Sequence, residues 1–276
     1  MKMGYNGATS MKADLATDIA CAAEAGFSGV EIWGAKLTEY LKKNSAESLK
    51  DIFEKHKVEP LSINSLEQAT LSEGAKWQEI QKRMAELSRL AAKIGAKRVI
   101  VVPSPLGPPQ WKDRTRMLAK TVESLKALSK IAQDEGALGC FEMLGFGDCS
   151  VNTLALATDL VKQVDHPSMG LTLDTFHYYV GSSTVDMIAA VPKGKLFMVH
   201  INDSQDLPKT QLQDSNRLFP GEGAIPLDSI FGALKKAGYG GPVSIELFNP
   251  QYWTWDSKKI AKRAYETVNE VLCRKS

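Results

Sequence analysis

Short runs of apolar, β-branched residues alternate with longer stretches of helical periodicity along the chain. Eight runs are typical of strands, over residues 3–5, 29–33, 60–64, 98–102, 138–143, 170–173, 196–201 and 243–247. Apolar positions spaced by three and four residues predict helices over about 14–25, 37–56, 77–94, 114–135, 152–164, 185–191, 227–237 and 257–272. Ser45 is a candidate internal cap that would divide the second of these helices, and Gly26, Gly95 and Gly136 mark helix ends.

This alternation predicts a parallel sheet covered by helices. Eight strand–helix units within 276 residues are typical of a single closed (β/α)8 TIM barrel. An open doubly wound sheet is the alternative, but no GxGxxG motif follows the first strand. Nothing in the composition divides the chain, so we expect one domain over residues 1–276. The proline-rich segment 103–110 predicts a rigid loop over one mouth of the barrel.

Composition and charge exclude several other classes of protein. Hydrophobic residues make up 43% and charged residues 24%, which excludes a disordered or collagenous chain. The net charge of +2 favours no nucleic-acid partner, and no apolar run approaches the ~20 residues that span a membrane. The N-terminus lacks the apolar core of a signal peptide, and the four cysteines form no CxxC pair. We therefore expect a cytoplasmic protein with reduced thiols.

Polar side chains end four consecutive predicted strands, the fifth to the eighth. These residues are Glu142, Asp174, His200 and Glu246. Because chemistry in a barrel is found at the carboxyl ends of its strands, we expect the four side chains to share one rim.

Three carboxylates buried together would repel one another and raise each other's pKa. A divalent cation removes this conflict, and three carboxylates with one imidazole suit Mn²⁺, Mg²⁺, Co²⁺ or Zn²⁺. The rim therefore predicts one divalent metal ion. The alternative is that each residue only caps a helix or makes ordinary hydrogen bonds at the rim.

Other polar residues are predicted near the same rim. His177 could donate a hydrogen bond to a substrate oxygen or cap the following helix, and Arg217 could grip two oxygens or be a solvated loop residue. Asp203 could form a hydrogen bond to one of the metal ligands without binding the metal itself, or it could be a turn residue. Glu31 and Asn64 end the second and third strands, where either could contact a ligand, although Glu31 would equally suit a salt bridge.

Aromatic residues follow the last predicted strand. Trp253 and Trp255 could line the pocket or form a contact between subunits, and the sequence leaves both readings open.

Several segments resemble one known group of barrels. The chain is similar to the xylose-isomerase-like family of sugar isomerases, ketose 3-epimerases and endonuclease IV relatives. The segments that carry the resemblance are Asn6-Gly7-Ala8-Thr9, Phe141-Glu142, Cys149-Ser150-Val151-Asn152-Thr153, Leu173-Asp174-Thr175-Phe176-His177, His200-Ile201-Asn202-Asp203, residues 217–225 and Val243-Ser244-Ile245-Glu246-Leu247-Phe248.

The resemblance implies roles for individual residues. It implies that Glu142, Asp174, His200 and Glu246 bind the metal. In similar ketose epimerases the two glutamates also move protons, which here implies Glu142 and Glu246. The positions of His177 and Arg217 bind substrate hydroxyl and carbonyl oxygens in those relatives.

The resemblance also implies a substrate and an assembly. It is strongest to enzymes of inositol catabolism that interconvert 2-keto-myo-inositol and 1-keto-D-chiro-inositol through an enediolate. The expected partner is thus a small cyclic polyol ketone or a ketose, and the expected assembly is a homodimer or homotetramer. Residues 31–33 and 103–110 depart from the isomerase pattern on the substrate side.

Alternative functions use the same metal site. A ketose 3-epimerase, a hydroxypyruvate-type isomerase and a 3-dehydroshikimate-type dehydratase each stay open, as does a sugar-binding barrel without catalysis. A repair endonuclease would need a histidine-rich cluster of three metals, whereas the chain contains four histidines in all.

Overall fold

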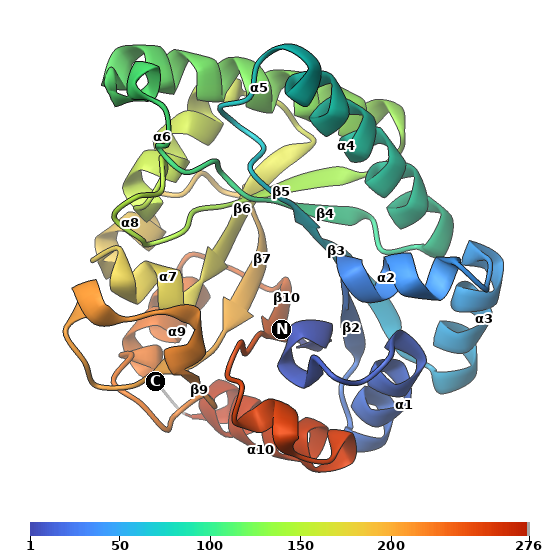
Figure 1. Cartoon of the computed structure of the whole chain (residues 1–276). Helices are drawn as coiled ribbons and strands as arrows, with labels where there is room; N and C mark the ends of the chain where they lie inside the picture. Colours follow the sequence, from blue (N-terminus) through green and yellow to red (C-terminus); the bar gives the residue numbers. More distant parts are fainter. Residues whose placement is uncertain (275–276) are drawn as a thin grey trace.

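The first strand of the chain pairs with the last strand of the barrel and closes it. In the computed structural model, which describes residues 1–274, Lys2 pairs with Pro242 and Tyr5 with Ile245 in a parallel register. Eight parallel strands form this closed barrel (Figure 1). They are β1 (Lys2–Asn6), β2 (Gly29–Trp33), β3 (Glu59–Leu66), β4 (Arg98–Val101), β5 (Leu138–Glu142), β6 (Met169–Asp174), β7 (Leu196–Ile201) and β10 (Pro242–Ile245). The predicted (β/α)8 architecture is confirmed.

A ring of helices surrounds the strands (Figure 1). The helices are α1 (Leu15–Ala25), α2 (Gly34–Leu41), α3 (Ala46–His56), α4 (Gly74–Ile94), α5 (Arg114–Asp134), α6 (Leu154–Val164), α7 (Thr175–Val180), α8 (Val185–Ala189), α9 (Leu227–Lys236) and α10 (Ser257–Cys273). Within residues 1–274, none of them combines the length and the apolar character that a bilayer crossing requires.

Local chemistry sets the helix ends. The Asp14 side chain accepts a hydrogen bond from the Thr17 amide at the start of α1, and Gly26 ends that helix at φ +105°, a left-handed conformation that favours glycine. The predicted helix over 37–56 is two helices, α2 and α3, because Ser45 caps the second one as its side chain suggested.

Two short features escaped the sequence pattern. Helix α7 has six residues, and strands β8 (Asp203–Ser204) and β9 (Arg217–Leu218) have two each. Elements of this length are too short to show a period of 3.6 or 2. They matter because α7 carries His177 and the β8–β9 hairpin carries Arg217.

A buried ion pair ties together three elements beside the barrel mouth. The Lys36 Nζ of α2 lies 2.6 Å from the Asp18 Oδ2 of α1. It also donates to the carbonyl oxygen of Ser10, in the 3-10 helix η1 (Gly7–Ser10). Both charged side chains are buried, at 8% and 0% exposure, so the contact fixes the chain around the first barrel strands.

Candidate active site

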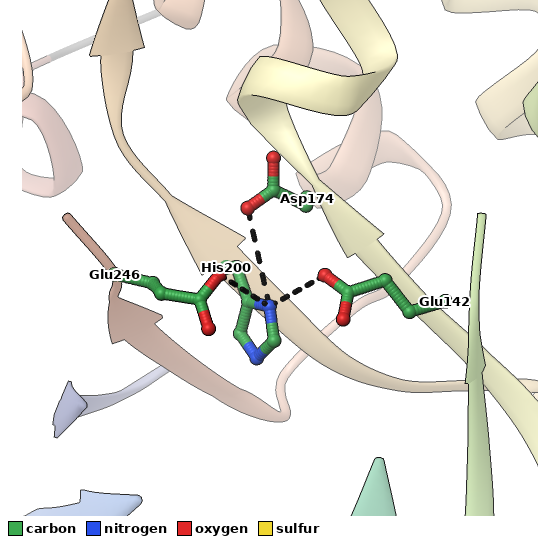
Figure 2. Close-up of side chains that lie close together, drawn as sticks. All are labelled: Glu142, Asp174, His200 and Glu246. Carbon is green, nitrogen blue, oxygen red and sulfur yellow. Dashed lines mark hydrogen bonds and ion pairs between the residues drawn. The ribbon is translucent and has the colours of Figure 1, made fainter. Parts of the chain in front are cut away.

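Four polar side chains from four strand ends converge on one point. His200 lies on β7 and Asp174 ends β6, and the two are paired in register. Glu142 ends β5, and Glu246 directly follows β10. Figure 2 shows three carboxylates directed at the Nδ1 atom of His200. The Nδ1 atom lies 2.7 Å from Glu142 Oε1, 3.4 Å from Glu246 Oε2 and 3.9 Å from Asp174 Oδ2.

We call Glu142, Asp174, His200 and Glu246 the rim cluster. Each residue offers one ligand atom, and these atoms all lie within 4.8 Å of one another. All four residues are buried. Three carboxylate oxygens and one imidazole nitrogen are a donor set that divalent cations accept, so the residues present fit such an ion.

The electrostatics of the rim cluster also suit a cation. Burial raises the pKa of Glu246 to about 8 and raises the pKa of Glu142. Burial alone would lower the pKa of His200, but the surrounding carboxylates, Glu142 foremost, raise it well above its usual value. Without an ion, the crowded carboxylates of the rim cluster therefore favour protonation of the cluster. A bound divalent ion would let the carboxylates stay ionised.

Arg217 is the buried cation beside the rim cluster, and all five of its N–H groups have protein acceptors. Nη1 donates to Asp174 Oδ2 at 2.8 Å and to Glu246 Oε2 at 3.0 Å. Nε and Nη2 both donate to Asp214, and Nη2 also donates to His177 Nε2 at 3.0 Å. Although burial opposes it, Arg217 lowers the pKa of Asp174 to about 2, which keeps this carboxylate ionised.

The contact with Arg217 fixes the protonation of His177. A guanidinium cannot accept a hydrogen bond, so His177 Nε2 accepts and Nδ1 carries the proton. Burial lowers the pKa of His177 to about 4, which leaves the ring neutral at neutral pH. Nδ1 is buried without a hydrogen-bond partner among residues 1–274. It is therefore a donor that an oxygen of a small molecule could satisfy.

Three asparagines that the sequence pattern did not single out as supports hold the rim carboxylates. Asn6 and Asn64 each donate from Nδ2 to Glu246 Oε1, at 3.0 and 2.8 Å. Asn202 donates from Nδ2 to Asp174 Oδ2 at 2.8 Å. Strand alternation gives a signal for Asn202, because it stands two residues after His200 and so shares its direction.

The weaker sequence candidates separate into two groups. Glu31 contacts His200 inside the barrel. Asp203 does not contact the rim cluster: it lies in β8, and its carboxylate accepts backbone N–H groups of Ser204, Gly221 and Ile225, so it holds the loop after β9 instead of a metal ligand.

The two tryptophans pack on their own neighbours. Trp253 donates from Nε1 to the carbonyl oxygen of Ala8, and the Trp255 ring stacks on Phe219. Neither contact reports on an interface between subunits.

Comparison with known sequences agrees with this architecture. The model of the family described as "Xylose isomerase-like TIM barrel" matches residues 19–271. Inosose isomerases of Halalkalibacterium halodurans and Bacillus subtilis are each 32% identical over 276 residues, which is 99% of this chain and 97% and 99% of those proteins. A 3-dehydroshikimate dehydratase of Pseudomonas putida is 28% identical over 87% of this chain, but the match covers 37% of that protein.

Solved structures show the same fold. The IolI protein, crystallised with a bound zinc atom, superposes with a TM-score of 0.94 at 31% identity, over 99% of this chain and 98% of its own. A D-psicose 3-epimerase of Clostridium cellulolyticum shares the fold with a TM-score of 0.79 at 23% identity, over 99% of both chains. The family match over most of the chain and these full-length relatives establish that the chain belongs to the xylose isomerase-like TIM barrel family.

Proposed function

We propose that this protein is a divalent-metal-dependent isomerase that interconverts 2-keto-myo-inositol and 1-keto-D-chiro-inositol in inositol catabolism. The observation that carries the proposal is the convergence of the rim cluster at His200 Nδ1, in a chain aligned end to end with inosose isomerases. An isomerase acting on a cyclitol accounts for both. The choice among Zn²⁺, Mn²⁺, Co²⁺ and Mg²⁺ is left to experiment.

In this proposal Glu142, Asp174, His200 and Glu246 hold the ion. A bound divalent cation supplies Lewis-acid stabilisation of the negative charge that develops on the substrate oxygens. Arg217 keeps Asp174 ionised and orients Glu246, because its Nη1 bridges their carboxylates. Asn6, Asn64 and Asn202 fix the same two carboxylates through their amide groups.

Two carboxylates are available to move protons. The isomerisation removes the proton from the hydroxyl-bearing carbon next to the carbonyl and delivers a proton to the former carbonyl carbon. The hydroxyl proton passes to the other oxygen, so the carbonyl moves by one ring carbon. Glu142 ends β5 and Glu246 directly follows β10, and the two side chains approach His200 from opposite sides (Figure 2). We assign one as the base and the other as the acid.

His177 and Arg217 orient the substrate in this proposal. The Nδ1–H of His177 is the free donor, and it suits a hydroxyl or carbonyl oxygen of the polyol. The five donors of Arg217 are already engaged, so a substrate oxygen would share one of them rather than meet a free group. Arg217 therefore supports both the substrate and the carboxylates that act on it.

The other activities have less support. The dehydratase match covers a minor part of that protein, and the psicose epimerase structure has 23% identity and shows the fold alone. Two expectations from the sequence stay predictions: that residues 1–276 form one domain, and that the protein assembles as a homodimer or homotetramer. Size-exclusion chromatography with light scattering would test the assembly.

A substrate panel tests the proposed function. Purified protein is analysed for bound metal and then assayed with 2-keto-myo-inositol before chelation, after chelation and after each divalent ion is restored. Parallel assays use D-fructose, D-tagatose and 3-dehydroshikimate. We expect turnover of the keto-inositol that is lost on chelation and restored by an ion. Faster turnover of a ketose, or formation of an aromatic product, would replace the proposal with the corresponding alternative.

A further inference from the structure

A fourth carboxylate lies inside the barrel behind His200. Glu31 is on β2 and is fully buried. Its Oε1 lies 3.1 Å from His200 Nε2, the ring nitrogen that faces away from the rim cluster. The Nδ2 group of Asn64 donates to the same oxygen at 3.3 Å. The imidazole thus stands between three carboxylates at Nδ1 and one at Nε2.

The position of Glu31 is costly unless the imidazole compensates for it. A buried carboxylate without a cationic partner destabilises a folded protein by several kcal/mol. Among residues 1–274, His200 is the one basic side chain within 4.0 Å of Glu31. The 3.1 Å separation between Oε1 and Nε2 makes the Glu31 carboxylate a hydrogen-bond acceptor for that ring nitrogen.

We infer that Glu31 is a positioning residue for His200: its carboxylate holds the proton on Nε2 and leaves the Nδ1 lone pair directed at the rim cluster. A histidine that binds a metal through one nitrogen commonly donates the other N–H to a carboxylate, which fixes the tautomer and the ring plane. This inference rests on the proposed divalent-metal site. It adds a residue to that site that neither the ligand set nor the family comparison assigns.

Two substitutions separate the acceptor of Glu31 from its charge. Glu31→Gln removes the charge but keeps an amide oxygen, and the Asn64 donor favours the orientation in which this oxygen faces His200. Glu31→Ala removes both. Asp18→Asn is the matched control, because it also removes a buried carboxylate but lies in the ion pair with Lys36, away from the rim cluster.

Two measurements are made on each variant. The dissociation constant for Zn²⁺ is obtained by competition with a chromophoric chelator, and circular dichroism checks the fold. The protonation of His200 in the zinc-loaded protein is read from long-range ¹H–¹⁵N NMR, in which four histidines give a simple spectrum. In the wild type we expect zinc on Nδ1 and a proton on Nε2.

The expected order of zinc affinity is wild type, then Glu31→Gln, then Glu31→Ala. We expect losses of about 10-fold for Glu31→Gln and up to about 100-fold for Glu31→Ala, the range found for carboxylates that support ligating histidines. In Glu31→Ala the Nε2 proton signal should also weaken or move, while Asp18→Asn should bind zinc like the wild type.

Other outcomes overturn the inference in distinguishable ways. Equal affinity losses in Glu31→Gln and Glu31→Ala with an unchanged Nε2 proton would mean that Glu31 acts by charge alone. Wild-type affinity in Glu31→Ala would remove Glu31 from the site while leaving the proposed metal site intact. A wild-type protein that binds no divalent ion would overturn the metal site itself, and the inference with it.

Discussion

Both carboxylate oxygens of Glu246 are held by neighbouring donors. Asn6 and Asn64 donate to Oε1, and Arg217 donates to Oε2. Such fixed geometry is what a group needs if it is to take or give a proton at a defined carbon. Burial also raises the pKa of Glu246 to about 8, so its protonation state near neutral pH depends on the charges of the neighbouring groups.

Substituting this residue tests its place in the proton transfer. Glu246→Gln keeps the shape, and its amide oxygen can still accept from Asn6 and Asn64, but its NH2 group cannot accept from Arg217 and the side chain cannot exchange a proton. We therefore expect kcat for the keto-inositol to fall by a factor of about 10²–10⁴. Stopped assays on metal-loaded protein measure this loss. Glu59→Gln, an exposed carboxylate paired with Lys2, is the control and should keep wild-type turnover. A Glu246→Gln enzyme within a few-fold of wild type would remove this residue from the catalytic pair.

The helices are positioned by their caps as much as by their apolar faces. At α3, the Ser45 Oγ accepts from the Ser48 amide at 3.1 Å, and the Ser48 Oγ accepts from the Ser45 amide at 3.2 Å. This reciprocal capping box ends the connection from α2 and starts a new helix. It explains why one predicted helical stretch became two.

Loss of this cap should be measurable. Ser45→Ala leaves the Ser48 amide without its side-chain acceptor and should lower the free energy of unfolding by about 1 kcal/mol. Urea denaturation followed by circular dichroism gives the value. Ser229→Ala, an exposed position in α9, should change it by less than about 0.5 kcal/mol. Equal effects at both positions would show that the capping box contributes nothing specific.

At the scale of the whole molecule, two groups of buried charges link stability to solution conditions. One is the rim cluster with Arg217, at the carboxyl ends of the strands. The other is the Asp18–Lys36 pair, which joins α1, η1 and α2. Because buried charges are costly unless compensated, both should respond to ions or protons.

Metal binding should stabilise the folded chain. An ion that binds the folded state alone contributes roughly 2.7 kcal/mol when its free concentration is 100 times Kd. The apo-protein melting temperature should therefore rise by several degrees on addition of Zn²⁺, and excess chelator should reverse the rise. Differential scanning calorimetry measures both changes. His200→Ala should lose the response, and an equal response in that variant would place the ion elsewhere.

The Asp18 carboxyl should make stability fall with rising pH. Burial raises its folded pKa to about 6 from 3.8, so the folded state keeps a proton that the unfolded state has released. Between pH 4 and pH 7 the free energy of unfolding of the wild type, relative to Asp18→Asn, should fall by about 2.4 kcal/mol. Urea titrations across this range measure it. A difference that grows with pH would mean that attraction to Lys36 outweighs burial.

The sequence alone determined the order of the elements and the residues of the rim. Apolar runs with period 2 and helical periods of 3.6 are local properties, so the eight strands could be counted without coordinates. Chain connectivity then places the end of every parallel strand on one side of the barrel, which brought Glu142, Asp174, His200 and Glu246 together in prediction. Helix α7 and the two-residue strands β8 and β9 were not predicted, because fewer than two helical turns or a single strand pair carries no clear period.

The tertiary structure alone decided what each side chain contacts. The partners of the rim cluster are far apart in sequence: 169 residues separate Glu31 from His200, and 240 separate Asn6 from Glu246. Their meeting depends on the register between neighbouring strands and on closure of β1 against β10. A shift of one residue in a strand would turn its side chain to the other face. For this reason the identity of the four candidate metal ligands could be predicted from the sequence. Only the folded barrel showed that Glu31 contacts His200, that asparagine amides hold the carboxylates, and that every donor of Arg217 has an acceptor.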